Sequence, residues 1–178
     1  MKYVALLRGI NVGGNAKVDM SRLKNVFEAL GCVNVKTYIN SGNVLFTDNH
    51  SIVDLIKSIE TAIQDEFGFT VPVILRTADN IKAVCSYVPK TWTNDIAQRT
   101  DVMFLWDEID NEDIMQMIII NPKLENVIYS SGALIWNIAR ENVTRGAGIK
   151  LIKSDVYKHM TVRNINTVRK LNELLGTS

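Results

Sequence analysis

The sequence predicts an α+β fold, because strand-like and helix-like segments alternate in a regular order along both halves of the chain. The first half has the order β-α-β-β-α-β, which is that of the split βαβ, or ferredoxin-like, unit. Two hairpin segments also resemble each other, NSGNVLF at 40–46 and SSGALIW at 130–136. From this similarity we predict two ferredoxin-like subdomains derived from an internal duplication, the second of them degenerate.

The first half divides at its capping and turn residues. Asp19 and Ser51 are good N-cap residues, and each precedes an apolar pattern with helical spacing. Ser41-Gly42 can supply the positive φ of a tight hairpin turn. Pro72 lies inside the fourth expected strand, which must then be a sheet edge, because proline has no N–H to donate to a neighbour. The expected strands are residues 3–8, 35–40, 44–47 and 71–76, and the two helices end at Gly31 and Gly68.

The second half is less regular. We expect it to lack its fourth strand and to end in a helix that begins at Thr161, with Ile165, Val168, Leu171 and Leu175 on one side. A basic helix is expected before it, over about 145–158, with Ile149, Ile152 and Val156 facing inward. The other expected elements are strands at 102–106, 127–129 and 134–138 and a helix over 110–117. The predicted divisions are a subdomain at 1–77, a connecting helix and linker at 78–99, and a second subdomain at 100–178.

Composition places the chain among ordinary globular proteins. It has 178 residues, 47% of them apolar, and a net charge of +1. No apolar run approaches the length of a membrane span, and no disulfide framework is present, so we expect a cytoplasmic protein without membrane contact. Cys32 and Cys85 are expected to be buried apolar residues. Charge is uneven: residues 1–50 carry six Lys/Arg against three Asp/Glu, residues 101–150 four against eight, and residues 151–178 five against two. The basic ends would form one patch if they meet.

The segment LLRGINVGGNAKVDM, residues 6–20, joins the first strand to the first helix. Its glycines match neither the Walker A spacing nor G-x-G-x-x-G. Anion sites do lie between a strand and a helix, although Asp19 at the cap would repel an anion. The loop runs to about ten residues, longer than the roughly two to six usual for such a connection. We therefore favour a loop that binds an anion or polar ligand over a structural turn, with Arg8 and Lys17 supplying positive charge.

Two further polar clusters accompany this loop. The hairpin YINSGN contributes Tyr38, Ser41 and Asn43, and the segment TVRNINTVRK places Arg163, Asn164 and Thr167 in the first turns of the last expected helix. Each cluster alone would be an ordinary turn or helix cap. Together they would suit one polar, anionic ligand if they converge.

Catalytic and metal-binding patterns are few. Only His50 and His159 are present, so no histidine-rich metal site is predicted. Asp155 and His159 could share a helix face, but a surface pair is the simpler interpretation. The sequence does not decide whether the protein is an enzyme. Asp19 and Tyr38 are the only candidate bases near the first loop, and no cofactor is indicated.

The motifs ALLRGINVGG, MSRLKNVFEALG, VKTYINSGNVLF and TVRNINTVRKL resemble the bacterial domain-of-unknown-function family 1697. The resemblance covers most of the chain, and its first eighty residues are the most specific part. It implies an α+β protein with two ferredoxin-like subdomains, and no assigned activity, substrate or cofactor. The family motif positions correspond to Arg8, Gly9, Asn11, Gly13, Gly14, Lys17, Tyr38, Ser41, Gly42, Asn43, Arg163, Asn164 and Thr167. Ile165 stands where family members have tryptophan.

Our main hypothesis is one basic, polar pocket that binds a phosphate-bearing small molecule or a nucleotide. Arg8, Lys17 and Arg163 would neutralise charge, and Asn11, Ser41 and Asn43 would orient the ligand. The predicted ligand-binding residues are Arg8, Asn11, Gly13, Gly14, Lys17, Tyr38, Ser41, Asn43, Arg163 and Asn164. Two alternatives stay open, a nucleic-acid-binding protein that uses the basic C-terminal stretch, and a non-catalytic interaction module that uses the acidic segment 107–113.

Overall fold

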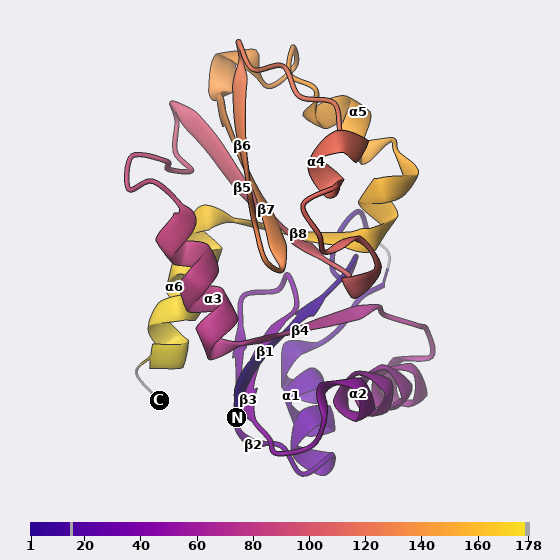
Figure 1. The fold of residues 1–178 in the computed structure, drawn as a ribbon. Coiled ribbons are helices and arrows are strands. Elements are labelled where there is room, and N and C mark those ends of the chain that lie inside the picture. The colour runs from indigo at the N-terminus through magenta and orange to yellow at the C-terminus, as the bar shows by residue number, and fades with distance from the viewer. Residues whose placement is uncertain (15, 177–178) are drawn as a thin grey trace. The chain divides into compact units, whose positions relative to one another are not determined.

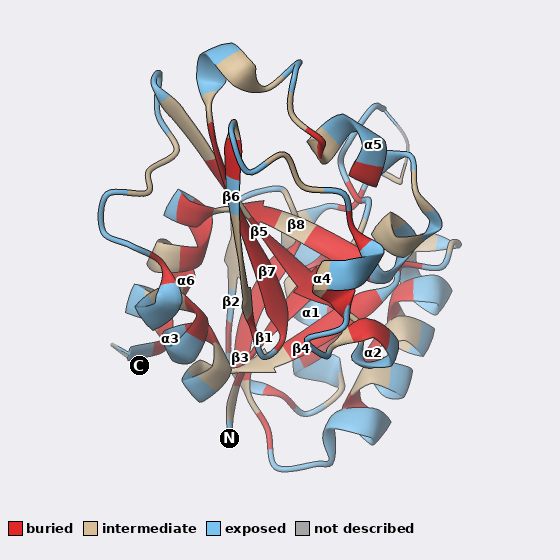
Figure 2. Ribbon diagram, turned by 45° about the horizontal axis from the view of Figure 1, so that its top comes forward, coloured by how far each residue is buried: buried red, intermediate tan, exposed pale blue. Residues whose placement is uncertain are grey.

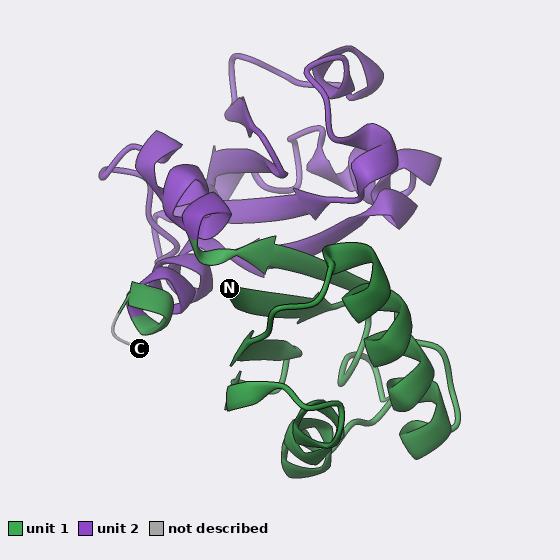
Figure 3. Cartoon of the chain, turned by 60° about the horizontal axis from the view of Figure 1, so that its bottom comes forward, with its two compact units in different colours: residues 1–78, 174–178 green, residues 79–173 purple. Residues whose placement is uncertain are grey.

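The computed structural model describes residues 1–14 and 16–176, and the chain forms two compact units. The first unit comprises Met1–Ala78 together with the residues from Leu174 onward, and the second comprises Asp79–Glu173 (Figure 3). Each unit contains a four-stranded antiparallel sheet, and the described residues include six α-helices (Figure 1). The predicted α+β class is therefore confirmed. None of the helices in the described part of the chain has the length and apolarity needed to cross a membrane.

The first unit follows the predicted order of elements. Its sheet has the strand order β2-β3-β1-β4, so β4 is an edge strand, as Pro72 predicted. Pro72 itself lies just before β4 and not inside it, because a strand paired with β1 needs donors that proline lacks. The Pro72 carbonyl instead accepts a bond from the Arg8 N–H at 3.0 Å. The elements are β1 Lys2–Leu7, α1 Met20–Ala29, β2 Val33–Tyr38, β3 Asn43–Thr47, α2 Ile52–Phe67 and β4 Val73–Thr77.

Both helices of this unit begin at the predicted caps and cover one face of the sheet. The Asp19 side chain accepts a bond from the Arg22 N–H, and Ser51 does the same for Asp54. Gly68 ends α2 with a φ of 80°, in the left-handed region that glycine adopts at low cost. The helices bury an apolar stripe against the sheet (Figure 2). That stripe consists of Leu23, Val26 and Phe27 of α1 and Leu55, Ile59 and Ile63 of α2.

The second unit has the strand order β6-β7-β5-β8, again with every neighbouring pair antiparallel. The expectation that it lacks a fourth strand is wrong. Residues 160–164 pair with β5, and α6 begins only at Ile165. The elements are α3 Ala78–Tyr87, β5 Gln98–Leu105, the 3-10 turn η1 Asp107–Ile109, α4 Ile114–Met117, β6 Glu125–Ser130, β7 Ala133–Ala139, η2 Arg140–Asn142, α5 Gly148–Ile152, η3 Asp155–His159, β8 Met160–Asn164 and α6 Ile165–Gly176.

The helices between the strands of the second unit are shorter than predicted. The basic stretch 145–158 forms only α5 and η3, since Gly148 favours helix weakly and the Ser154 hydroxyl donates to the Leu151 carbonyl. Leu151 is the buried residue of α5. Ile149 and Ile152 are 42% and 52% exposed, so they are not the buried core residues that were expected, although both border a hollow over the sheet. The side of α6 with Ile165, Val168, Leu171 and Leu175 is buried, as predicted.

The hairpins of the two sheets are attached to their first strands in the same way. The Leu7 N–H donates to the Gly42 carbonyl at 2.8 Å, and the Leu105 N–H donates to the Gly132 carbonyl at 3.0 Å. Both glycines have positive φ, 77° and 90°. The similarity between NSGNVLF and SSGALIW is therefore matched by equal positions in the two sheets.

Candidate functional site

The long loop between β1 and α1 is held together by one side chain, Asn11. Its amide nitrogen donates to the Val18 carbonyl at 3.0 Å and to the Asn40 carbonyl at 2.9 Å, while its amide oxygen accepts from the Val18 N–H at 2.9 Å. The Asn11 N–H also donates to the Ala16 carbonyl. Asn11 thus joins both ends of the loop to the β2–β3 hairpin. Its side chain is engaged in holding the loop, which leaves it little capacity to orient a ligand.

Gly13 and Gly14 form an exposed turn at the tip of this loop. Their φ angles are 64° and 82°, in the left-handed region that glycine adopts at low cost. No atom lies within 4 Å of a Cβ built at either residue, so the surface above them is open. Their function in the fold is conformational, and their backbone is accessible to a ligand.

The hairpin residues predicted for the site are largely engaged as well. Asn43 is fully buried, and its amide nitrogen donates to the Tyr38 carbonyl and the Ser41 hydroxyl at 3.0 and 3.1 Å. A Cβ at Gly42 would lie 2.7 Å from side-chain atoms of Ile10 and Leu7, so the turn packs directly under the loop. Asn43 therefore closes the hairpin and does not reach the surface, whereas Ser41 and Tyr38 are partly exposed.

An open depression lies where this loop meets the start of α1. Lys17 and Asp19 give it one side chain of each charge. The Asp19 carboxylate is committed to the Arg22 N–H at 2.8 Å, so it acts as a helix cap more than as a general base. The depression is lined by Asn11, Gly14, Lys17, Val18, Asp19, Met20, Ser21 and Asn40.

Arg163 and Asn164 belong to the second unit, at the end of β8. They are strand residues and not, as predicted, part of the first turn of a helix. Their segment pairs with β5, which makes Thr161 and Val162 strand residues too. The Arg163 side chain is buried and donates to the Thr161 hydroxyl and the Val162 carbonyl. Burial lowers the pKa of its guanidinium to about 10.

Arg76 has the matching position in the first unit. It is the fourth residue of β4, as Arg163 is of β8, and its guanidinium likewise donates to the carbonyl of the residue before it, Leu75. Each arginine is followed by one polar residue and then a helix. The predicted residues around Arg8 and those around Arg163 are thus parts of two separate units with similar construction.

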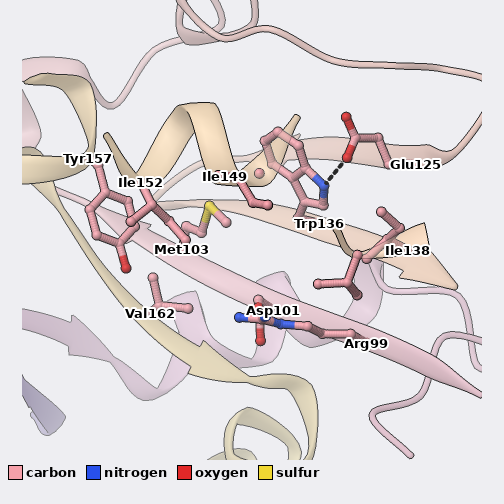
Figure 4. A pocket seen from close by; sticks show the side chains of 12 residues that line it. Arg99, Asp101, Met103, Glu125, Trp136, Ile138, Ile149, Ile152, Tyr157 and Val162 are labelled. Carbon is pink, nitrogen blue, oxygen red and sulfur yellow. Dashed lines mark hydrogen bonds and ion pairs between the residues drawn. The ribbon is translucent and has the colours of Figure 1, made fainter. Parts of the chain in front are cut away.

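The sequence-based prediction missed a second feature, which lies on the sheet of the second unit. Arg99 and Asp101 form an ion pair, with Arg99 Nε 2.7 Å from Asp101 Oδ2. They line a hollow whose other walls are mostly apolar (Figure 4). Strand alternation is the signal that would have found it, since Arg99 and Asp101 share a face with Met103.

Residues 1–14 and 16–176 contain neither a cluster of metal-ligating side chains nor a cysteine with a lowered pKa. That part of the chain contains no group of three or more His, Cys, Asp or Glu side chains placed to hold a metal ion. The Cys32 thiol is buried beside Asp48, and burial, followed by the Asp48 charge, raises its pKa to about 12. Burial also raises the pKa of Cys85. Neither thiol has the lowered pKa of a nucleophile.

Residues 1–135 match the family described as "Protein of unknown function (DUF1697)". The chain belongs to this family. This DUF1697 protein is also similar to a solved structure, that of the conserved bacterial protein SP0830 from Streptococcus pneumoniae. The two chains are 30% identical, each is covered over 98% of its length, and the TM-score is 0.84. A comparison with curated proteins finds no match. The motifs that suggested the DUF1697 family therefore identified it correctly.

Proposed function

We propose that the loop–hairpin end of the first unit binds a small anionic ligand, either a phosphate-bearing small molecule or a nucleotide. The observation that carries this proposal is the hydrogen bond from Asn11 to the Asn40 carbonyl, which fixes the long loop against the hairpin. It leaves Lys17 and the Gly13–Gly14 turn exposed around one open depression.

Fewer residues are proposed to contact the ligand than the sequence predicted. Lys17 lines the depression with its positive charge, and Gly14 and Ser21 line it too. Backbone N–H groups near a helix start suit an anion. Asn11 and Asn43 hold the loop and hairpin in shape. Arg163 and Asn164, in the second unit, stay a prediction, as does the cytoplasmic location.

The test is a binding measurement on the full chain with inorganic phosphate and ADP. Lys17→Ala should weaken binding at least tenfold, while Lys57→Ala, an exposed lysine on α2, should leave it unchanged. A ligand at about 100 times its dissociation constant should stabilise the protein by roughly 2.7 kcal/mol, enough to see in thermal unfolding. Equal losses in both variants, or no stabilisation by either probe, would refute the proposal.

The nucleic-acid alternative is tested in the same panel with oligonucleotides. Backbone binding depends steeply on salt and grows with the number of phosphates contacted. Tight oligonucleotide binding that falls with salt, with no response to ADP, would favour that alternative. The interaction-module alternative depended on the acidic segment 107–113. In this segment Asp110 turns inward, accepting bonds from the Tyr129 hydroxyl and the Gly132 N–H.

We also infer that the two units are copies of one ferredoxin-like unit. Equal strand order, the equivalent Gly42 and Gly132 bonds and the equivalent arginines of β4 and β8 support this. If so, Gly132→Ala should destabilise the second unit about as much as Gly42→Ala destabilises the first. A stability unchanged by Gly132→Ala would count against equivalent hairpins.

A further inference from the structure

The most unusual side chain of the second unit is a carboxylate on the core-facing side of its sheet. Side chains alternate along a strand, so Asp101, Met103 and Leu105 of β5 point to the same face. Met103 and Leu105 are part of the hydrophobic core there. Asp101 therefore lies in the row of core positions, where charged groups are rare unless they are paired or used.

The sheet of the first unit shows what this position holds when it serves packing alone. The last residues of β4 and β8, Thr77 and Asn164, pair with Tyr3 and Asp101 respectively. Tyr3 is thus the counterpart of Asp101, and it is only 2% exposed. A packing residue in one sheet corresponds to a charged residue in the other. Functional sites are where such departures from packing rules are expected.

The helix that covers this face of the sheet also differs between the two units. In the first unit α2, with 16 residues, seals the face of the sheet, whereas α5, which follows the corresponding strand, has five residues. A hollow of about 70 Å³ remains. Figure 4 shows Ile149 and Ile152 of α5 on one side of it and the strands on the other. Its apolar lining includes Met103, Trp136, Ile138, Ile149, Ile152 and Val162.

The size of the hollow limits what can fill it. About 10–15 Å³ of such space holds one water molecule, so the hollow has room for roughly five water-sized groups. A branched aliphatic side chain of about four carbons would fit, and an extended lipid chain would not. Ligand pockets in general are apolar with a few polar groups that fix orientation.

The ion pair at the edge of the hollow supplies those polar groups, because the Glu125 carboxylate, which also lines the hollow, already accepts bonds from the N–H groups of Asn121, Trp136 and Ala147. Arg99 uses its Nε for Asp101 Oδ2, and within the described chain neither its Nη groups nor Asp101 Oδ1 makes a hydrogen bond. The Arg99 side chain is 41% exposed and that of Asp101 is 14% exposed. The pair can therefore donate to a carboxylate and accept from an ammonium at the same edge. A simple anion would be repelled by Asp101, and a simple cation by Arg99.

We propose that this hollow binds an aliphatic α-amino acid, or the same zwitterionic group on a slightly larger molecule. Arg99 binds the carboxylate, Asp101 binds the ammonium, and the apolar walls enclose the side chain. The site lies wholly in the second unit and is independent of the anion site proposed at Lys17. The two can therefore fail separately.

The experiment is calorimetric titration of the full chain with L-leucine, supported by NMR of the Trp136 indole N–H, which lies in the wall. L-leucine should bind and shift the Trp136 signal. Three analogues each lack one feature: N-acetyl-leucine has no ammonium, leucinamide has no carboxylate, and glycine has no side chain. Each should bind at least tenfold more weakly. Equal binding of N-acetyl-leucine or of glycine, or no binding of leucine at millimolar concentration, would overturn the proposal.

Two variants and a matched control complete the test. Arg99→Gln and Asp101→Asn should each weaken leucine binding at least tenfold while the fold is retained, as judged by the thermal unfolding temperature. The control is the Asp155–Lys158 pair, which has the same 2.7 Å separation but is highly exposed on η3 and does not line the hollow. Asp155→Asn and Lys158→Gln should leave binding unchanged. Equal weakening in the control variants would mean that a general charge effect, and no site, is responsible.

Discussion

Glu125 is a buried carboxylate that accepts several N–H bonds, and replacing it with glutamine should strongly destabilise the second unit. It is 2% exposed. Its Oε1 accepts from the N–H groups of Asn121 and Ala147 at 2.8 and 3.0 Å. Its Oε2 accepts from the Trp136 indole N–H and again from Ala147, both at 3.1 Å. Glutamine has the same shape, but its amide nitrogen must face either the Asn121 N–H or the Trp136 indole N–H, and that donor loses its acceptor, whereas the Ala147 N–H can keep the remaining oxygen.

The magnitude follows from that count. One buried donor left without an acceptor costs about 1–3 kcal/mol. For a chain of this length, about 1 kcal/mol shifts the midpoint of thermal unfolding by roughly 2–4 °C, so the expected drop is at least about 2 °C. Because Asn121 and Ala147 flank β6 and α5, the loss should also loosen the chain around both.

Urea unfolding followed by tryptophan fluorescence is a suitable assay. All three tryptophans, Trp92, Trp106 and Trp136, lie in the second unit, so the signal reports on that unit. Glu108→Gln, which changes an exposed carboxylate of η1, is the control and should change stability little. A loss below about 1 kcal/mol for Glu125→Gln would refute the reasoning, because it would mean that the donors find other acceptors or water.

Two further predictions concern the hairpins. Gly42→Ala should destabilise the first unit more than Gly68→Ala. Both glycines have a φ near 80°, but only a Cβ at Gly42 would collide, at 2.7 Å from Ile10 Cδ1. Equal losses of stability by calorimetry would show that the loop around Ile10 moves to accept the Cβ. Burial, then the bond to Asp110, raises the pKa of Tyr129 to about 12, so its contribution to stability is present below pH ~10 and is lost as pH rises from about 10 to 12. The stability difference between wild type and Tyr129→Phe in urea should shrink over that range, and a constant difference would contradict the assignment.

Local signals in the sequence were sufficient to predict the helices and strands of the first unit. Asp19, Ser51 and Gly68 act through their own neighbours in the chain, so caps and helix ends can be recognised without knowing the fold. The edge position of β4 was also predicted correctly, although Pro72, on which the prediction depended, lies just before the strand and not inside it.

The second unit depended on contacts that are distant in sequence. Thr161 resembles an N-cap, and only pairing with β5 makes its segment a strand. The glycine and serine in the basic stretch lower its helix propensity, and this effect outweighs the apolar period that favours a long helix. The unusual position of Asp101 could be recognised from the sequence, since every second residue of a strand faces the same side and Arg99, Asp101 and Met103 therefore share a face.

The candidate loop illustrates a different limit. Its sequence indicated polar residues but not what their amides bind, and in the structure the amide of the exposed Asn11 bonds to the backbone of the chain itself. The backbone conformation of the loop supports a ligand-binding function in another way. Asn11 and Ala16 have φ values of 55° and 49°, a left-handed conformation that costs of order 1–3 kcal/mol at a non-glycine residue and persists only where surrounding bonds enforce it. A loop that is longer than usual, strained, and fixed by three bonds of one amide is pre-organised, and pre-organisation lowers the entropic cost of binding a ligand.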